Sequence, residues 1–342
     1  MPYSLRQHNT FGIEATCTKF VEYDNEEQLR AALADLQPSD SHAQAPRWLH
    51  IGSGSNLLFL HPHFEGHVLH SRIRGIEVVE QDNDNVTLRV GAGEDWDAFV
   101  AHCVAQGYFG LENLSHIPGE VGASAVQNIG AYGTEVAERI ASVETLSVNS
   151  GERRIFSPEE CKYAYRSSIF KHELRQQYVV THVSFQLDRT FLPVLTHAAL
   201  MQQLQAQNIE PQTATAQQVR QAVIAVRSAK LPDPKELGSA GSFFMNPVIP
   251  EQQAASLLEL YPSMPHYPAA NGIKIPAAWL IEQCGWKGKS LGPAAVHKQQ
   301  ALVLVNANQA SGQDIAALAA AIQQDVKSRF DIFIQPEVLY IT

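Results

Sequence analysis

The 342-residue sequence is short of cysteine and of basic side chains, and it has no long apolar run. Its four cysteines lie far apart without C-x-x-C spacing, so neither a disulfide framework nor a metal site is indicated, and a reducing cytoplasm fits best. The net charge of −10 argues against nucleic acid or an anionic membrane as the main partner. Nowhere do about eighteen apolar residues run together, and the N-terminus lacks an apolar leader. We therefore predict a soluble, unexported protein.

The chain contains enough apolar residues to form globular cores, and it contains several glycine-rich loops. Hydrophobic residues make up 45% of the sequence, which is ample for globular cores, and the length predicts two or three domains. An anionic small ligand stays possible despite the net charge, because local cations and backbone N–H groups can bind it in a pocket.

The segment 110–133, GLENLSHIPGEVGASAVQNIGAYG, holds five glycines and one proline among few charges. We predict a loop without helix or strand. Glycines permit positive φ and leave N–H groups bare, as a chain needs when it lies against a phosphate or a flat ring. A large anionic cofactor is one interpretation, and a rigid surface turn is the other.

A second glycine loop, 52–56 (GSGSN), is predicted between strands at 48–51 and 57–60. Its spacing is not G-x-G-x-x-G and no helix follows, so a Rossmann fingerprint is not supported. Backbone donors and the hydroxyls of Ser53 and Ser55 suit a diphosphate.

The remaining pattern predicts alternating strands and helices. Asp24 and Glu27 form a capping-box pattern that opens a helix to about residue 36, and Gly107 stands where a helix beginning near residue 96 would end. Ser157 and Pro158 predict a further short helix, and 200–216 looks like a linker. The other expected strands are 68–90 in short pieces, 143–148, 154–156, 178–187, 301–305, 332–334 and 338–341, and the other expected helices are 215–230, 252–260, 276–284 and about 315–326.

Three polar residues stand out in apolar or glycine-rich surroundings. Arg166, between an aromatic residue and two serines, could grip a carboxylate or form an ordinary salt bridge. Ser242, in GSAGSFFMNP, could be a nucleophile, a proton donor or part of a tight turn, although no G-x-S-x-G elbow is present. Glu337 lies in an apolar segment, where a carboxylate is costly to bury unless it is paired or functional. A lone His297 is more simply a hydrogen-bonded structural residue.

Taken together, the motifs resemble the UDP-N-acetylenolpyruvoylglucosamine reductase family of peptidoglycan synthesis, in the form with a mobile substrate-closing loop. The resemblance covers nearly the whole chain and runs through NTFGI, GSGSNLL, GLENLSHIPGEVGASAVQNIGAYG, YRSSIFK, KLPDPKELGSAGSFFMNP, WLIEQCGWKG, AAVHKQQALVLVN and PEVLYI. It implies an α+β protein with an FAD-binding fold of the vanillyl-alcohol oxidase type, made of two α/β subdomains, and a C-terminal substrate domain. The implied boundaries are 1–72 completed by 330–342, then 73–229, then 230–329.

The same resemblance implies a reaction and its residues. NADPH reduces FAD and leaves, and UDP-N-acetylglucosamine enolpyruvate then takes hydride at its terminal vinyl carbon to give UDP-N-acetylmuramate. Arg166 and Glu337 match family residues that stabilise the developing enol, and Ser242 matches the serine that supplies the proton. Lys230 and Asn246 match substrate contacts, and His197 stands where a loop tyrosine is expected. The implied FAD contacts are Gly52, Ser53, Gly54, Ser55, Asn56, Pro118, Gly119, Gly122, Ala123, Gln127, Asn128, Gly130, Ala131, Tyr132 and Gly133.

Two rival interpretations of the sequence remain open. A flavin oxidase of the same fold acting on another substrate would show oxygen reactivity, and the Ser242 motif argues against it. A flavin-binding protein without catalysis would be expected to lack Arg166, Ser242 or Glu337. For the reductase we expect a cytoplasmic monomer whose partners are small molecules.

Overall fold

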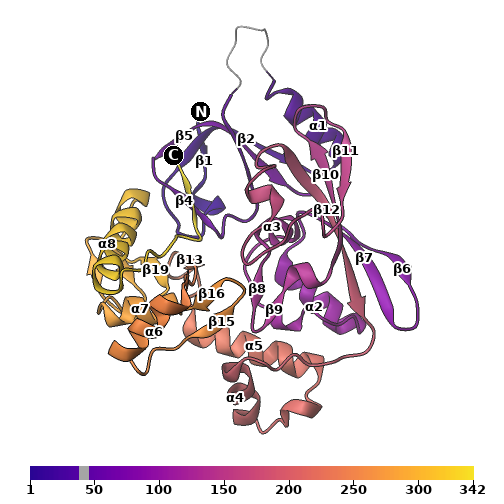
Figure 1. The fold of residues 1–342 in the computed structure, drawn as a ribbon. Coiled ribbons are helices and arrows are strands. Elements are labelled where there is room, and N and C mark those ends of the chain that lie inside the picture. The colour runs from indigo at the N-terminus through magenta and orange to yellow at the C-terminus, as the bar shows by residue number, and fades with distance from the viewer. Residues whose placement is uncertain (38–45) are drawn as a thin grey trace. The chain divides into compact units, whose positions relative to one another are not determined.

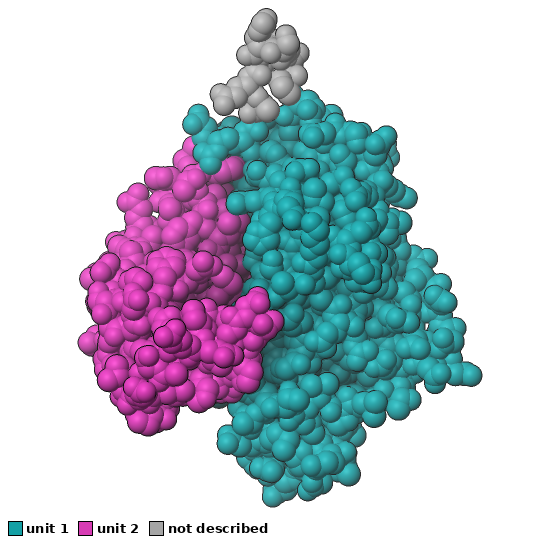
Figure 2. Space-filling model, in the orientation of Figure 1, with its two compact units in different colours: residues 1–3, 17–53, 65–229 teal, residues 4–16, 54–64, 230–342 magenta. Residues whose placement is uncertain are grey.

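The structure is a computed structural model that describes residues 1–37 and 46–342 (Figure 1). Its chain divides into two compact units, shown in two colours in Figure 2. Unit 1 comprises residues 1–3, 17–53 and 65–229, and unit 2 comprises residues 4–16, 54–64 and 230–342. No helix of the described residues is both long and apolar enough to cross a membrane.

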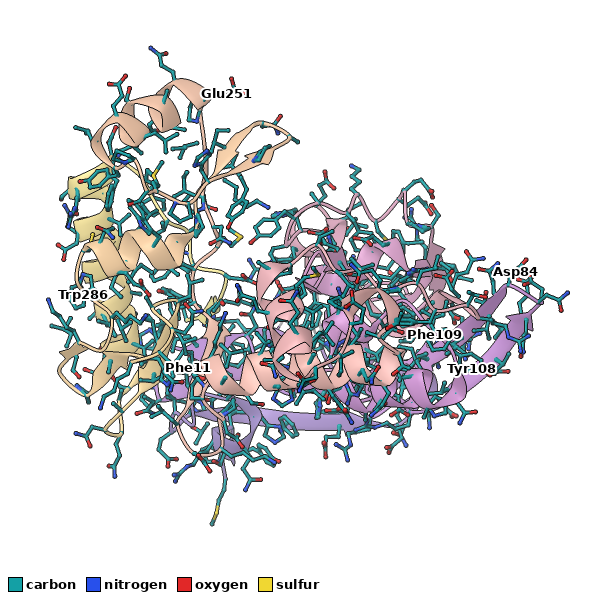
Figure 3. All side chains as sticks on the ribbon, turned by 90° about the horizontal axis from the view of Figure 1, so that it is seen from below. Phe11, Asp84, Tyr108, Phe109, Glu251 and Trp286 are labelled. Carbon is teal, nitrogen blue, oxygen red and sulfur yellow. The ribbon has the colours of Figure 1, made fainter. Side chains whose placement is uncertain are left out.

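The centre of unit 1 is an antiparallel five-stranded sheet in the order β11-β10-β12-β7-β6. Its strands are β6 (Ile76–Gln81), β7 (Asn85–Gly91), β10 (Ile140–Ser147), β11 (Arg153–Phe156) and β12 (Tyr178–Asp188). Asp84 lies in the turn between β6 and β7, at the tip of a projecting hairpin (Figure 3). The predicted short strands within 68–90 and the predicted strands 143–148, 154–156 and 178–187 are confirmed.

Two helices, α2 (Trp96–Gln106) and α3 (Val121–Gln127), share one apolar core with this sheet. Trp96 is fully buried there, and its indole N–H donates to the carbonyl of Leu114 at 2.9 Å. Gly107 adopts the left-handed conformation (φ 75°) and ends α2, as predicted. A smaller core joins α1 (Glu26–Ala34) to buried residues of β5 (His63–Ser71), β10 and β12.

A further four-stranded sheet has the order β1-β2-β5-β3, in which β3 and β5 run parallel. The strands are β1 (Tyr3–Ser4), β2 (Thr16–Tyr23), β3 (Trp48–Ile51) and β5 (His63–Ser71). Unit 1 also contains the short hairpin β8 (Gly130–Ala131) and β9 (Thr134–Glu135), and the helices α4 (Ala198–Ala206) and α5, which runs Ala216–Lys230 and ends at the unit boundary.

Unit 2 is built from three small sheets and three helices around a large core and a second, smaller one. The antiparallel sheet β13-β19-β18-β17 consists of Ser239–Ser242, Val303–Asn306, Ala294–Val296 and Ser290–Leu291. The sheet β14-β16-β15 consists of Val248–Ile249, Gly272–Lys274 and Tyr267–Ala269, and β20 (Leu339–Ile341) pairs in parallel with β4 (Leu57–Phe59). The helices are α6 (Glu251–Leu260), α7 (Ala277–Gln283) and α8 (Gly312–Phe330).

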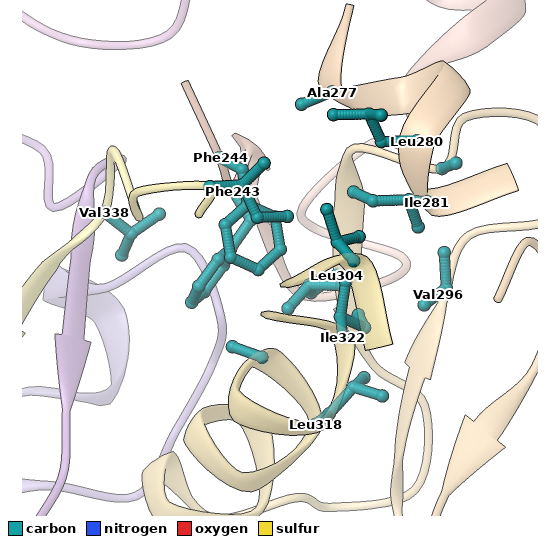
Figure 4. Packing of buried hydrophobic residues seen from close by; sticks show 14 of the residues in the cluster. Phe243, Phe244, Ala277, Leu280, Ile281, Val296, Leu304, Leu318, Ile322 and Val338 are labelled. Atoms are coloured by element: carbon teal, nitrogen blue, oxygen red, sulfur yellow. The ribbon is translucent and has the colours of Figure 1, made fainter. Parts of the chain in front are cut away.

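Phe243 and Phe244 lie at the centre of the large core, among side chains from α7, α8 and the following strands (Figure 4). Both rings are buried, and their centroids are 5.1 Å apart in an edge-to-face arrangement. Burying a phenylalanine contributes roughly 2 to 3 kcal/mol, so the pair fixes the adjacent Ser242 on a stable segment.

Several local predictions were wrong. The segment 110–133 contains α3, and the supposed linker 200–216 contains most of α4. No helix follows Ser157, and 332–334 forms no strand. The first helix is capped by Asn25, whose side chain accepts from the N–H of Gln28 at 2.9 Å, rather than by Asp24.

Candidate active site

The glycine-rich segment in unit 1 is anchored by backbone hydrogen bonds on both sides of Glu120. The N–H of Trp96 donates to the carbonyl of Gly119 at 3.1 Å, and the N–H of Val121 donates to the carbonyl of Glu94 at 2.9 Å. Gly119 has φ 141°, which only glycine adopts readily. The start of α3 is therefore held firmly on the loop that precedes α2.

Protein atoms closely approach Gly122 and Gly52, and the contact at Gly122 is too short for a side chain unless the neighbouring chain shifts. A Cβ at Gly122 would lie 2.8 Å from Cβ of Ala92, and a Cβ at Gly52 would lie 3.1 Å from Oε2 of Glu120. The loop after β3 thus packs against the start of α3. This contact brings together two segments that the sequence assigned to FAD.

Asn128 follows α3 with φ 47° and organises the chain around it. Its side-chain N–H groups donate to Oε2 of Glu135 and to the carbonyl of Ala164, both at 2.8 Å, and its Oδ1 accepts from the N–H of Ala137 at 3.2 Å. These bonds occupy both donors of the amide. Asn128 therefore fixes the segment that carries Arg166, and its predicted contact with FAD stays a prediction.

Arg166 has φ 54°, a conformation that is uncommon for a residue with a side chain. Its guanidinium donates to the carbonyls of Asn128, at 3.4 Å, and of Gly130, and it lies 5.1 Å from the ring centre of Tyr165. Nζ of Lys171 donates to the backbone carbonyl of Arg166 at 2.7 Å. The half-buried guanidinium is thus positioned at the end of the glycine-rich segment.

Asn113 was not singled out in the sequence, yet it joins two predicted parts of the site. Its buried amide donates to the carbonyls of Tyr132 and of Val194, both at 2.9 Å. His197, three residues after Val194, lies edge-on to Tyr132 with ring centres 4.9 Å apart, and its Nδ1 accepts from the N–H of Ala199 at 3.3 Å. The predicted substrate residue His197 therefore also caps α4.

The Tyr132 hydroxyl meets Arg227 of α5, a second residue that sequence reasoning missed. Burial raises the pKa of Tyr132, and the hydrogen bond from Arg227 opposes that shift. Arg227 also donates to the carbonyl of His116 at 3.0 Å, and burial lowers its pKa. The only sequence signal was a cation near the end of an amphipathic helix, which is usually a solvated residue.

In unit 2 two predicted catalytic residues lie on hydrogen-bonded segments. Ser242 ends β13 and is exposed, and Phe243 and Phe244 continue into the core. The N–H of Glu337 donates to the carbonyl of Phe243 at 2.8 Å, and the N–H of Met245 donates to the carbonyl of Gln335 at 2.9 Å. Main-chain pairing thus brings together the segments of Ser242 and Glu337, which are 95 positions apart in the sequence.

Asn56 secures the same segment from the other side. Its side chain donates to the carbonyl of Glu337 at 3.2 Å, and its own carbonyl accepts from the N–H of Leu339 at 3.0 Å. Asn246 begins the approach to α7, and its Oδ1 accepts from the N–H of Ala277 at 2.9 Å. Lys230 is exposed at the end of α5.

Two family models match this chain, one mostly within unit 1 and the other within unit 2. Residues 18–157 match a family model described as an FAD binding domain, and residues 233–341 match the C-terminal domain of UDP-N-acetylenolpyruvoylglucosamine reductase. Curated reductases of that name share 48% identity in Bacteroides fragilis, over 99% of this chain and 99% of the relative. The Salmonella typhi relative shares 44%, over 100% of this chain and 96% of its own length.

A crystal structure of the reductase from Thermus caldophilus has the same fold, with a TM-score of 0.69 at 22% identity over 100% of this chain and 98% of that chain. An FAD-binding domain joined to this C-terminal domain defines an FAD-dependent oxidoreductase of α+β class. The chain belongs to the UDP-N-acetylenolpyruvoylglucosamine reductase family. The predicted family, fold class and FAD cofactor are confirmed.

The residues present fit FAD. The buried Oγ of Ser53 and Oε1 of Gln127 have no hydrogen-bond partner among the described residues, although buried polar atoms normally have one. Both belong to segments expected to bind the cofactor. A ligand with several donors and acceptors would satisfy them.

Proposed function

We propose that this protein reduces UDP-N-acetylglucosamine enolpyruvate to UDP-N-acetylmuramate with NADPH, in peptidoglycan synthesis. The observation that carries the proposal is full-length identity of 44% to 48% with reductases of that name. The main-chain pairing that brings Ser242 and Glu337 onto neighbouring segments supports it.

When bound, FAD supplies a carrier that takes hydride from NADPH and delivers it to the vinyl carbon of the substrate. Arg166 would then stabilise the negative charge that develops on the enol and carboxylate oxygens. A guanidinium suits this role because it stays charged and donates two parallel hydrogen bonds. Its bonds to the carbonyls of Asn128 and Gly130 orient it before substrate arrives.

Ser242 would donate a proton to the carbon next to the carboxylate, and Glu337 would stabilise the enol as the proton moves. A serine hydroxyl is a weak acid, so this step requires a strongly basic intermediate and a proton relay. Phe243 and Phe244, buried behind Ser242, limit the movement of its backbone. Glu337 is half-buried, and its backbone N–H and carbonyl hold its segment in place.

Lys230, Asn246 and His197 would contact the UDP-sugar. Lys230 supplies the local cation that an anionic substrate needs on an acidic protein. Asn246 is fixed by its bond to Ala277, so its amide nitrogen has a defined direction. We also propose that the other FAD contacts predicted from the sequence are made. The same proposal includes the predicted division into three domains and a monomer located in the cytoplasm.

A product assay tests this function. Purified protein, NADPH and the enolpyruvyl sugar are incubated, and the product is analysed by mass spectrometry. We expect a product heavier than the substrate by two hydrogens, because one hydride and one proton are added across the vinyl bond. Oxidation of NADPH without change in the sugar would contradict the proposed substrate.

A further inference from the structure

A chain of three titratable side chains, of which His70 and Glu120 are buried and Glu22 is exposed, has no role in the proposed reaction. Nε2 of His70 lies 2.8 Å from Oε1 of Glu120, and Nδ1 of His70 lies 3.1 Å from Oε1 of Glu22. His70 is 4% exposed and Glu120 is 8% exposed. The histidine therefore fixes the orientation of a buried carboxylate.

The second oxygen of that carboxylate faces the GSGSN loop. A Cβ at Gly52 would lie 3.1 Å from Oε2 of Glu120, so a side chain there would crowd this oxygen. His70 contacts the other oxygen, Oε1. Glu120 occupies the N-cap position of α3, but its side chain makes no capping bond.

Two further observations indicate that this oxygen serves a ligand. The neighbouring Ser53 hydroxyl is buried and unpartnered among the described residues. The backbone around Glu120 is held by the bonds at Gly119 and Val121 described above, so the carboxylate cannot easily turn away. A carboxylate in a buried residue is costly unless donors reach its oxygens.

We propose that Glu120, oriented by His70, accepts a hydrogen bond from a hydroxyl of the sugar-alcohol or ribose part of bound FAD. A hydroxyl is the matching chemistry because the carboxylate accepts only and would repel the diphosphate. Ser53 binds beside it and satisfies its own hydroxyl in the same way. The inference rests on FAD binding, and the UDP-sugar plays no part in it.

The competing explanation is that Glu120 only braces the two loops. The test therefore compares FAD with two analogues, one lacking the 2′-hydroxyl of the ribityl chain and one lacking the 2′-hydroxyl of the adenosine ribose. Apoprotein is titrated with each, and Kd is measured from flavin fluorescence. The variants are Glu120→Ala, Glu120→Gln and His70→Asn, with Glu22→Gln as matched control because Glu22 touches His70 but not the loop.

We expect the original protein to bind one analogue about 10- to 100-fold more weakly than FAD, the size of one charge-assisted hydrogen bond. Glu120→Ala should bind FAD more weakly by the same factor, and it should bind that analogue no more weakly than the original protein does. Glu120→Gln and His70→Asn should weaken FAD binding by part of that factor. Glu22→Gln should change Kd by less than about threefold. Unfolding of each apoprotein checks that the variants fold.

If Glu120→Ala weakened the binding of FAD and of both analogues by the same factor, Glu120 would have only a structural role, and the proposal would be overturned. So would an original protein that binds both analogues as tightly as FAD. A protein that binds no flavin would overturn the proposal together with the cofactor assignment. Failure of the UDP-sugar as substrate leaves every one of these titrations unaffected.

Discussion

The backbone N–H of Glu337 donates to the carbonyl oxygen of Phe243 at 2.8 Å, one residue beyond Ser242. This bond links the end of β13 to the segment that leads into β20. An isolated bridge between Phe244 and Pro336 extends the pairing. Because main-chain groups make these contacts, substitution of the Ser242 or Glu337 side chain, for which we propose catalytic roles, should leave the segments paired.

The first prediction concerns Ser242. Ser242→Ala should leave reduction of the flavin by NADPH nearly intact and slow the second half-reaction by at least about 100-fold, since proton donation contributes about 10²–10⁴. Rapid mixing measures each half-reaction separately. Ser242→Cys, which retains an acidic proton, should recover part of the rate. Equal slowing of both half-reactions by Ser242→Ala would contradict the role of this residue.

Glu337 provides the second prediction. Glu337→Gln should lower the rate of the second half-reaction while the free energy of unfolding changes by less than about 1 kcal/mol, because the bonds of its N–H and carbonyl persist. The measurements are single-turnover kinetics and urea unfolding on one preparation. A large loss of stability with unchanged kinetics would make Glu337 a structural residue.

Gly54 tests how two segments of unit 2, residues 54–64 and 4–16, pack against each other. It has φ 73°, and a Cβ there would lie 1.9 Å from the carbonyl oxygen of His8. Gly12 is the control, since it has φ 64° but open space around it. In urea unfolding, Gly12→Ala should cost about 1 kcal/mol from backbone conformation alone.

Gly54→Ala should cost several-fold more than that control, because the clash involves backbone and cannot be relieved by a rotamer change. Similar losses for the two variants would mean that the loop can move away from His8.

The fourth prediction is a pH dependence centred on His70. Burial acts to lower the pKa of His70, but hydrogen bonds and charge from Glu120 and Glu22 outweigh it and raise the pKa above the ordinary 6.5. A raised pKa in the folded state means that the stabilisation is complete below the unfolded value and is lost as pH rises through the folded value. The free energy of unfolding should therefore fall as pH rises above about 6.5.

His70→Asn should flatten this fall, measured by urea unfolding between pH 6 and 9. His50 affects stability at lower pH than His70 does, because burial and the charge of His70 lower the pKa of His50 to about 4. Its stabilisation is lost as pH falls below 6.5, so the two effects are separable. An unchanged slope above pH 6.5 in His70→Asn would contradict the assignment.

Much of the fold could be predicted from the sequence where local signals and burial agree. Gly107 ends α2 as expected, and the helix expected at 215–230 is α5, which Thr215 and Gln218 open with reciprocal hydrogen bonds. Period-two alternation likewise identified β7 and β12.

The errors have physical causes. The helix α3 was missed because its small residues were taken as loop residues, whereas Gly122 is small so that the helix can approach Ala92. After Ser157 the predicted cap bonds with Glu160 do form, but Lys162 adopts φ 47° and the chain turns away after one turn. Leu200 and Leu204 bury one face of α4, which composition alone did not reveal.

The candidate site was predictable only through the combined motifs. Arg166, Ser242 and Glu337 each had an ordinary structural explanation, and only their series identified the family. Glu120 carried a signal that was overlooked, an acidic residue inside a glycine-rich apolar segment. Asn113 and His70 carried none, because their roles depend on partners 19 to 81 and 48 to 50 residues away.

The most direct test of the proposed function is an anaerobic two-step titration of the FAD-loaded protein. NADPH should bleach the flavin absorption band, and the UDP-linked enolpyruvyl sugar added afterwards should restore it with one equivalent of product. Bleaching that the sugar does not reverse, although oxygen does, would contradict the reductase assignment and leave a flavin oxidoreductase of another specificity.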